Sequence, residues 1–194
     1  MSKNRSNFSR RAFLRRTAAL AVPAIVPASV FARNGAVPPS ERIILGGIGI
    51  GNRGSHDLRW MLPEPDVQFV ADCDPNKQRR EAVKNLVDTR YGNKDCKIYP
   101  DIREYLAERT DIDAMLVTTG DRWHALASIM AMRAGKDVYS EKPSCMTIAE
   151  GQAVVATAAR YRRIYQTGTQ RLSEGNFTFA NELLRLGRLG RVHT

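Results

Sequence analysis

The sequence predicts an α/β domain in which helices cover both faces of a doubly wound parallel sheet. From residue 43 onward, short apolar runs of strand length alternate with longer, more polar runs of helical length. This alternation is typical of parallel sheets, because a crossover between parallel strands usually contains a helix. A glycine-rich turn follows the first apolar run, and an acid stands about 20 residues further on. Together these observations favour a sheet that binds its ligand at the carboxyl ends of the strands.

Each expected element has a local reason. Apolar runs bounded by glycine, proline or polar residues are expected to be strands, at residues 43–48, 67–72, 97–99, 114–118, 137–140 and 163–166. The segments between and after them are expected to be helices, at residues 52–61, 76–90, 101–108, 123–133, 148 onward and 177–186. Asp101 is a typical N-cap, Thr147 and Glu150 have the spacing of a capping box, and Gly135 is expected to end a helix.

The glycine-rich turn predicts a phosphate-binding loop. Gly49, Gly51 and Gly54 form a GxGxxG between a strand and a helix, with Asn52 and Arg53 before the last glycine. The missing side chains let the backbone approach a pyrophosphate, whose charge the helix N-terminus stabilises. Arg53 is expected to add a direct phosphate contact. In this setting the motif predicts a Rossmann fold that binds a dinucleotide; a Rossmann-like domain for another nucleotide is the alternative.

The acid after the second strand bears on the choice of cofactor. Asp74 stands at the turn and is expected to accept both hydroxyl groups of the adenosine ribose, with Asp72 as the second candidate. A carboxylate at this place repels a 2′-phosphate, which favours NAD over NADP. Lys77, Arg79 and Arg80 follow closely and offer positive charge to a 2′-phosphate, so NADP stays open.

Residues 1–33 have the layout of a twin-arginine export signal. The pair Arg10-Arg11 precedes an apolar stretch that is interrupted by prolines. A small-residue cleavage site follows that stretch. This stretch is too short and too broken for a good membrane span, and a basic tail or an amphipathic surface helix is the alternative. The signal predicts a periplasmic protein that meets the twin-arginine export machinery. Residues 34–41 are rich in breakers and are expected to be a linker.

The net charge of +10 is concentrated in the same segment. Seven of the 30 basic residues and no acid lie in residues 1–33, which leaves 23 basic against 20 acidic residues in the rest. That remainder has no basic stripe with interleaved aromatic residues, so nucleic acid is not an expected partner. Cys73, Cys96 and Cys145 are scattered and have no metal-site spacing. We therefore expect unreactive thiols, without a disulfide framework or a metal site.

Several downstream segments carry a more specific pattern. They are residues 113–118, the pair Trp123-His124, and residues 134–143, which end in Glu141-Lys142-Pro143. In this order they resemble the glucose–fructose oxidoreductase/inositol dehydrogenase (Gfo/Idh/MocA) family, of which Glu-Lys-Pro after a strand is the most specific mark. The resemblance implies an NAD(P)-binding Rossmann domain over residues 42–185. It also implies that residues 186–194 begin the family's second, α+β domain, which is otherwise absent from this chain.

The resemblance implies roles for the Glu-Lys-Pro segment. Lys142 would lie beside the nicotinamide and the substrate, where it polarises a hydroxyl group or exchanges its proton. Glu141 is expected to hold the nicotinamide ribose or to orient Lys142. Pro143 is expected to fix the backbone so that Lys142 points inward, and a cis peptide bond is one way to do so.

The segment before it is implied to border the cofactor. Thr118, Thr119 and Trp123 are expected to bind it. His124 is expected near the nicotinamide ribose, either in the catalytic and cofactor-binding site or as a cap of its own helix, and the sequence leaves both readings open.

The expected activity is hydride transfer between a sugar or polyol carbon and a nicotinamide cofactor. An exported enzyme has no cytoplasmic cofactor pool, so the cofactor is expected to be tightly bound and recycled in place. A redox-neutral NAD-dependent glycosidase on the same scaffold, or a nucleotide-binding module without catalysis, are the alternatives. The family's second domain supplies most substrate contacts and usually mediates oligomerisation. This chain alone is therefore expected to be incomplete for catalysis, and the full-length protein to be a homo-oligomer.

Overall fold

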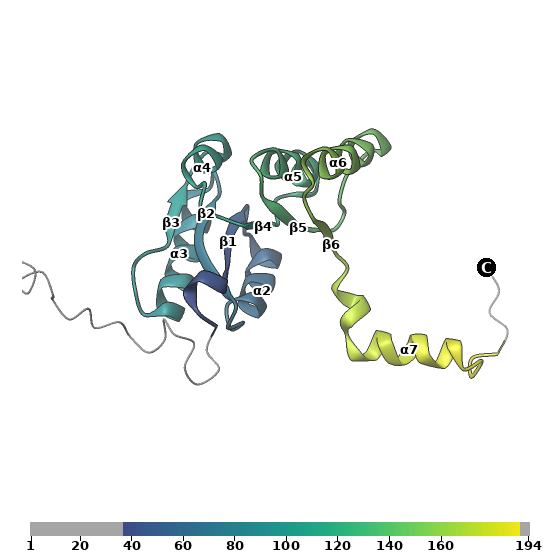
Figure 1. Ribbon diagram of the computed structural model, residues 1–194. Helices are drawn as coiled ribbons and strands as arrows, with labels where there is room; N and C mark the ends of the chain where they lie inside the picture. The colour runs from purple at the N-terminus through teal and green to yellow at the C-terminus, as the bar shows by residue number, and fades with distance from the viewer. Residues whose placement is uncertain (1–36, 191–194) are drawn as a thin grey trace, which may run out of the picture. The chain divides into compact units, whose positions relative to one another are not determined.

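A parallel six-stranded sheet forms the centre of the computed structural model, which describes residues 37–190 (Figure 1). Its strands are β1 (Ile43–Ile48), β2 (Val67–Cys73), β3 (Lys97–Tyr99), β4 (Ala114–Val117), β5 (Asp137–Glu141) and β6 (Tyr165–Gly168). They lie in the order β3-β2-β1-β4-β5-β6, and every neighbouring pair is parallel. The chain thus builds outward from β1 in one direction and from β4 in the other, which confirms the predicted doubly wound sheet.

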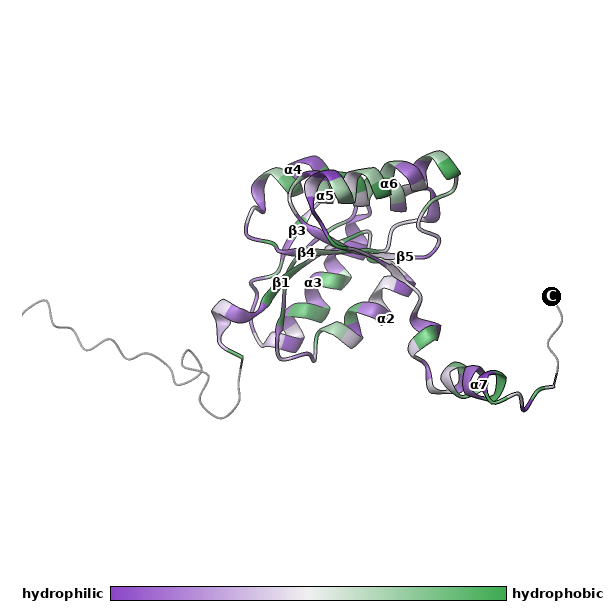
Figure 2. Cartoon of the chain, turned by 45° about the vertical axis from the view of Figure 1, so that its right-hand side comes forward, coloured by the Kyte–Doolittle hydropathy of each residue, from purple (hydrophilic) through white to green (hydrophobic). Residues whose placement is uncertain are grey.

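Helices cover both faces of this sheet. They are α2 (Asn52–Met61), α3 (Lys77–Tyr91), α4 (Ile102–Glu108), α5 (His124–Arg133) and α6 (Ile148–Tyr161). A further helix, α7 (Gly175–Arg185), follows β6 and has no buried residue. The short 3₁₀ helices of the described residues are η3 (Pro39–Glu41), η4 (Asp121–Trp123) and η5 (Gln170–Ser173). α2 and α3 lie on one face, and α4, α5 and α6 lie on the other (Figure 2). The central strands β1, β2 and β4 are therefore largely shielded from water on both sides, whereas the edge strands β3 and β6 keep exposed residues.

The core divides into two apolar clusters, one on each face. Neighbouring residues of a strand point to opposite faces, so β4 contributes to both. Met115 and Val117 are fully buried in the cluster that contains residues of α4, α5 and α6. Leu116, between them, is fully buried in the cluster that contains Leu58 of α2 and Val83 of α3. This two-sided burial explains why β4 appears in the sequence as a continuous apolar run.

Local signals fix several helix ends as predicted. Thr147 accepts a hydrogen bond from the Glu150 amide at 3.2 Å, and the Glu150 carboxylate accepts one from the Thr147 amide at 3.0 Å, which completes the capping box of α6. Asp101 caps α4 through the Arg103 amide at 2.8 Å. Gly135 follows α5 in the left-handed conformation, with φ +82°.

The last strand lies two residues later than its apolar run indicates. The run predicts a strand over residues 163–166, whereas β6 is Tyr165–Gly168. α6 ends in a left-handed residue, Arg162 at φ 54°, and the Arg163 amide still bonds back to the Ala158 carbonyl at 3.0 Å. The turn therefore uses residues that the sequence pattern assigns to the strand.

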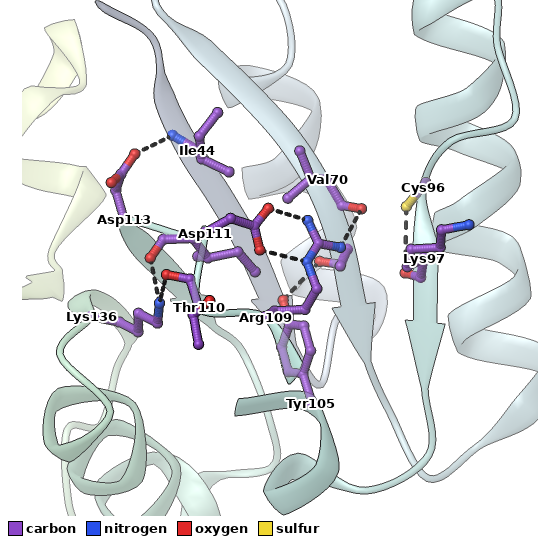
Figure 3. A network of polar contacts seen from close by, with 12 residues as sticks. Ile44, Val70, Cys96, Lys97, Tyr105, Arg109, Thr110, Asp111, Asp113 and Lys136 are labelled. Atoms are coloured by element: carbon purple, nitrogen blue, oxygen red, sulfur yellow. Dashed lines mark hydrogen bonds and ion pairs between the residues drawn. The ribbon is translucent and has the colours of Figure 1, made fainter. Parts of the chain in front are cut away.

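Side chains hold the segments that lead into β4 and β5, and another contacts β2 within the strand (Figure 3). The Lys136 ammonium, just before β5, donates to the carbonyl oxygens of Thr110 and Ile112 at 2.9 and 2.7 Å. The Tyr105 hydroxyl donates to the Ala71 carbonyl of β2 at 3.1 Å, and it fills the space next to Gly46 of β1. A side chain on Gly46 would overlap that hydroxyl. These contacts fix the loop before β4 and hence the height at which β4 ends.

Candidate functional site

A cleft of about 630 Å³ opens at the carboxyl ends of β1, β2 and β4. Its walls include Gly49 after β1, Asp74 after β2, and Thr119 and Trp123 after β4. In a doubly wound sheet this is the switch point, where the chain leaves neighbouring strands in opposite directions and a ligand finds room. A second depression, of about 680 Å³, lies along β2 and β3 and contains none of the predicted site residues.

The glycine loop has the shape that a pyrophosphate requires. Gly49 has φ +71°, and a side chain there would come within 2.8 Å of the Thr119 backbone. A side chain on Gly54 would overlap the Thr118 hydroxyl. At Gly51, the N-cap of α2, the nearest atom to an added side chain would be 3.7 Å away, on Arg79. Two glycines thus let the chain pack closely, and the third leaves the helix N-terminus open to an anion.

The two candidate acids are both buried but differ in their hydrogen-bond partners and in their access to the cleft. Asp74 lines the cleft, and its carboxylate accepts a hydrogen bond from the Asn76 amide at 2.7 Å. Asp72 is fully buried, and neither carboxylate oxygen has a hydrogen-bond partner among the described residues. Burial, with the Asp74 charge adding to it, raises the pKa of Asp72 to about 8. Asp74 is therefore the acid placed to meet a ribose.

Of the three basic residues that follow, only Arg79 lines the cleft. Lys77 pairs with Glu81 on the surface of α3 at 3.7 Å. The Arg80 guanidinium donates to the carbonyl oxygen of Asp74 at 3.1 Å and so braces the turn. A 2′-phosphate would thus find Arg79 rather than the other two.

Some of the residues after β4 support the glycine loop, and others line the cleft. The Thr118 hydroxyl is buried and donates to the Gly49 carbonyl at 3.2 Å, so it holds the glycine loop. Thr119 and Trp123 line the cleft, and Trp123 is 55% exposed there. The predicted cofactor contacts of Thr119 and Trp123 fit this geometry. Thr118 is placed to act through the loop.

Glu141 is the hub of the Glu-Lys-Pro segment. Its buried carboxylate accepts hydrogen bonds from Arg53 at 3.1 Å, from the Lys142 amide at 3.0 Å and from Gln170. Burial alone raises the pKa of Glu141, but hydrogen bonds from Gln170, the Lys142 amide and Arg53 outweigh it and hold the pKa below its ordinary value. The Lys142 side chain is exposed, and the Lys142–Pro143 peptide bond is cis.

His124 lies outside the residues that line the cleft, with 1% of its surface exposed. Its Nδ1 is 2.7 Å from the Pro143 carbonyl oxygen, and its Nε2 is 3.0 Å from that of Thr119. Trp123 is the N-cap of α5, so the capping alternative for the His124 side chain is wrong. A buried ring with both nitrogens on main-chain carbonyl groups is suited to positioning the two loops that it joins, and the expected place of His124 in the catalytic and cofactor-binding site stays a prediction.

Arg53 points away from the open helix N-terminus expected to hold the phosphates. Its guanidinium binds Glu141, pairs with Asp57 at 2.9 Å and lies over the Trp60 ring at 5.3 Å. The Arg53 guanidinium is therefore not positioned in this structure to make the predicted phosphate contact. Asp57 and Gln170 were missed by the sequence analysis. The spacing of Arg53 and Asp57, four residues apart on one helix, is the one signal that pointed to the pair.

Two of the three cysteines, Cys73 and Cys96, are buried free thiols, and Cys145 is partly buried. Burial raises the pKa of the Cys73 and Cys96 thiols to about 12, so both are poor nucleophiles at neutral pH. Within residues 37–190, no three His, Cys, Asp or Glu side chains gather as a metal site would need. In the same range, no helix combines the length and apolarity needed to cross a membrane.

Comparison with known proteins agrees with the geometry of this cleft. Residues 44–169 match the GFO_IDH_MocA family model, described as "Oxidoreductase family, NAD-binding Rossmann fold". A glycosyl hydrolase family 109 protein of Saccharopolyspora erythraea is 33% identical over 181 residues, covering 83% of this chain and 39% of that protein. An alpha-N-acetylgalactosaminidase of Bacteroides fragilis is 32% identical over 127 residues, covering 65% and 30%.

The fold also matches solved structures. The scyllo-inositol dehydrogenase of Lactobacillus casei, crystallised with NAD(H) and scyllo-inositol, aligns with a TM-score of 0.66 and 20% identity over 77% of this chain and 42% of that one. The chain spans less than two fifths of the length of either curated relative. The family match covers more than half of the chain, from β1 to the loop after β6. The chain therefore belongs to the Gfo/Idh/MocA oxidoreductase family, and it carries that family's NAD-binding Rossmann domain.

Proposed function

We propose that the protein transfers a hydride between a carbon of a sugar or polyol and a tightly held NAD. The observation that carries this proposal is the position of Lys142. It follows β5, the neighbour of β4, whose loop lines the cleft, and its amide is fixed on the buried Glu141 carboxylate. An exposed ammonium group on a fixed backbone is thus presented at the edge of the sheet where NAD binds.

The cleft residues divide the work of binding. The open N-terminus of α2 at Gly51 takes the pyrophosphate, and Asp74 takes the hydroxyl groups of the adenosine ribose. NAD supplies the hydride acceptor when it is bound. The Lys142 ammonium donates a hydrogen bond to the substrate oxygen and stabilises the charge that develops there, while the hydroxyl proton leaves to solvent as the hydride leaves the same carbon.

The test of this proposal is the Lys142→Ala variant of the full-length protein, produced in its native organism. NAD binding, measured by calorimetry, should change less than about threefold, because Lys142 lies outside the phosphate and ribose contacts. Turnover of a polyol, followed as NADH absorbance in single-turnover mixtures, should fall by about 100-fold or more. The matched control is Lys94→Ala, an exposed lysine on the surface between α3 and β3. Retained turnover in Lys142→Ala would remove lysine from the mechanism.

A redox-neutral NAD-dependent glycosidase is the second candidate, and the names of the curated relatives favour it. One relative is called a glycosyl hydrolase family 109 protein and another an alpha-N-acetylgalactosaminidase. A nitrophenyl glycoside distinguishes the candidates. Release of nitrophenol without net NADH supports the glycosidase, whereas NADH formed from a free sugar without glycoside cleavage supports the oxidoreductase.

We also propose that the protein is exported to the periplasm by the twin-arginine route. The expected signal, residues 1–33, lies outside the described residues, and the sequence pattern alone supports it. Export accords with a tightly held cofactor, because this route carries folded proteins and no free NAD pool awaits the enzyme outside the cytoplasm.

A further inference from the structure

Asp57 is a buried acid that the binding of NAD does not use. Only 2% of its surface is exposed, and the other buried residues of α2 are Gly54 and Leu58. Its partner is Arg53, at 2.9 Å, but the contact is not aligned as a hydrogen bond, and no other described residue donates one to the carboxylate. A buried carboxylate without aligned donors costs stability, so a residue kept for packing alone would be apolar.

Asp57 and Glu141 share one arginine. The Arg53 guanidinium reaches Asp57 with Nη2 and Glu141 with Nε, and the two acids come from different elements, α2 and β5. Burial raises the pKa of Asp57 to about 6 in spite of Arg53, and the Glu141 charge adds to the rise. Of the two acids, Glu141 therefore has the lower pKa and keeps its charge to lower pH, and it is Glu141 that accepts the hydrogen bond from the Lys142 amide.

The Arg53 side chain needs an anchor to serve Glu141. It is 47% exposed, and a long, half-exposed side chain loses conformational entropy when it is held in one rotamer. The Asp57 carboxylate, which cannot move because it is buried, holds one end of the guanidinium, and the Trp60 ring supports its face. With both in place, Nε faces Glu141.

We propose that Asp57 is a positioning residue for Lys142, acting through Arg53 and Glu141. The chain of contacts runs from Asp57 to Arg53, from Arg53 to the Glu141 carboxylate, and from that carboxylate to the Lys142 amide. It connects the helix that begins at the glycine loop with the strand that carries Lys142. The functional meaning of this connection rests on the proposed role of Lys142, but the connection itself is measurable without turnover.

The direct readout is hydrogen exchange at the Lys142 amide, which donates to Glu141 at 3.0 Å. Asp57→Asn keeps the shape of the side chain and removes its charge. We expect exchange of the Lys142 amide to speed up by about tenfold, the effect of weakening one charge-assisted hydrogen bond. The Thr118 amide, bonded to the Ile48 carbonyl at 3.0 Å in the same sheet, serves as the internal control and should keep its rate.

Two further variants separate positioning from general stability. Arg53→Lys keeps the charge, but an ammonium group cannot reach both carboxylates as a guanidinium does. This variant should therefore speed up hydrogen exchange at the Lys142 amide, as Asp57→Asn does. Asp57→Asn should unfold in urea at the same or a higher concentration than the natural protein, because it removes a poorly satisfied buried acid. The proposal would be overturned if hydrogen exchange at the Lys142 amide of Asp57→Asn were unchanged or slower, or if exchange at the Thr118 amide accelerated equally.

Turnover is measured separately, so that failure of the activity and failure of the positioning role remain distinguishable. If Asp57 positions Lys142, Asp57→Asn lowers kcat by about tenfold and leaves the KM for NAD within about twofold. Faster exchange of the Lys142 amide together with full turnover would show that the chain of contacts exists but does not matter for turnover, and it would overturn the positioning role of Asp57. The role of Lys142 itself is tested separately by Lys142→Ala.

Discussion

The imidazole of His124 lies 2.7 Å from the carbonyl oxygen of Pro143, with the opposite ring nitrogen on the Thr119 carbonyl. A neutral imidazole donates from one nitrogen and an imidazolium from both, so this ring always serves at least one of the two carbonyls. Thr119 lines the NAD cleft, and Pro143 follows Lys142. One buried side chain thus joins the loop after β4 to the turn after β5.

Removing this ring should cost stability. His124→Ala leaves a cavity and removes the ring that serves the carbonyl groups of Pro143 and Thr119, so the free energy of unfolding should fall by about 2–4 kcal/mol. Urea denaturation followed by circular dichroism measures it. The control is His56→Ala, an exposed histidine on α2, which should change stability by less than about 0.5 kcal/mol. Equal effects of the two substitutions would contradict the positioning role of His124.

The open helix N-terminus leads to a prediction about cofactor affinity. Gly51→Ala should fold normally, because the nearest atom to the new methyl group is 3.7 Å away. The methyl group would occupy the space where the pyrophosphate approaches the backbone, so the Kd for NAD should rise by about tenfold or more, which corresponds to about 1.4 kcal/mol. Isothermal titration calorimetry tests this.

Gly175→Ala is the matched control, since that glycine also has free space around it but starts α7. It should leave the Kd for NAD unchanged. An unchanged Kd in Gly51→Ala would place the phosphates elsewhere.

Cofactor preference should depend on two side chains of opposite charge. Asp74→Ala should weaken NAD by about tenfold or more, the value of a hydrogen bond to a charged group, and affect NADP less. Arg79→Ala should weaken NADP more than NAD, because Arg79 is the one of the three neighbouring cations that lines the cleft. Paired Kd measurements with both cofactors decide this, and equal losses for NAD and NADP in Asp74→Ala would move the ribose contact away from Asp74.

Asp72 should make stability depend on pH. Its pKa is about 8 in the folded protein because of burial and the Asp74 charge, against about 3.9 in an unfolded chain. Between these values the folded state binds one more proton than the unfolded state. The free energy of unfolding should therefore decrease as the pH rises from about 4 to about 8, by up to about 1.4 kcal/mol per pH unit.

Asp72→Asn removes this ionisation and should be more stable than the natural protein at about pH 8, with a flatter pH dependence. Urea unfolding of both proteins at about pH 5 and about pH 8 provides the comparison. The same decrease in both proteins would assign the pH dependence to other groups.

The export proposal predicts where the protein accumulates. Replacing Arg10 and Arg11 together by lysine keeps the charge but removes the paired arginines that the export machinery reads, so the protein should stay in the cytoplasm. Replacing Arg15 and Arg16 by lysine is the matched control and should leave export intact. Cell fractionation with immunoblotting measures both, and periplasmic protein from the first variant would overturn the proposal.

Local chemistry explains why much of the fold could be predicted. β1 and β3 have the predicted bounds, because Gly49 follows β1 and Pro100 follows β3, and both residue types interrupt strands. The capping box at Thr147 and Glu150 fixes the start of α6 within a few residues. β6 was misplaced because Arg162 adopts a left-handed conformation, which glycine and asparagine adopt far more often than arginine.

The contacts of the candidate site were harder to predict, because they depend on distance in space. Arg53 and Glu141 are 88 residues apart in the sequence, and His124 and Pro143 are 19 apart. The glycine motif indicated a phosphate site near Arg53, yet the packing of α2 against β5 directs that guanidinium to Glu141. No short-range pattern contains this information.

The pair Gly46 and Tyr105 has a consequence for the evolution of this sequence. The hydroxyl group of Tyr105 occupies the volume that any larger residue at position 46 would need. A descendant with alanine at position 46 should therefore also have lost the tyrosine at position 105 and have shifted the Ile112 side chain, whose Cδ1 would lie 2.8 Å from the new methyl carbon. The substitutions at positions 46 and 105 should be found together. Gly46 lies just before the phosphate loop, and a sequence search could count it as part of the cofactor motif. Such a search would misinterpret the paired substitution at positions 46 and 105 as a loss of NAD binding.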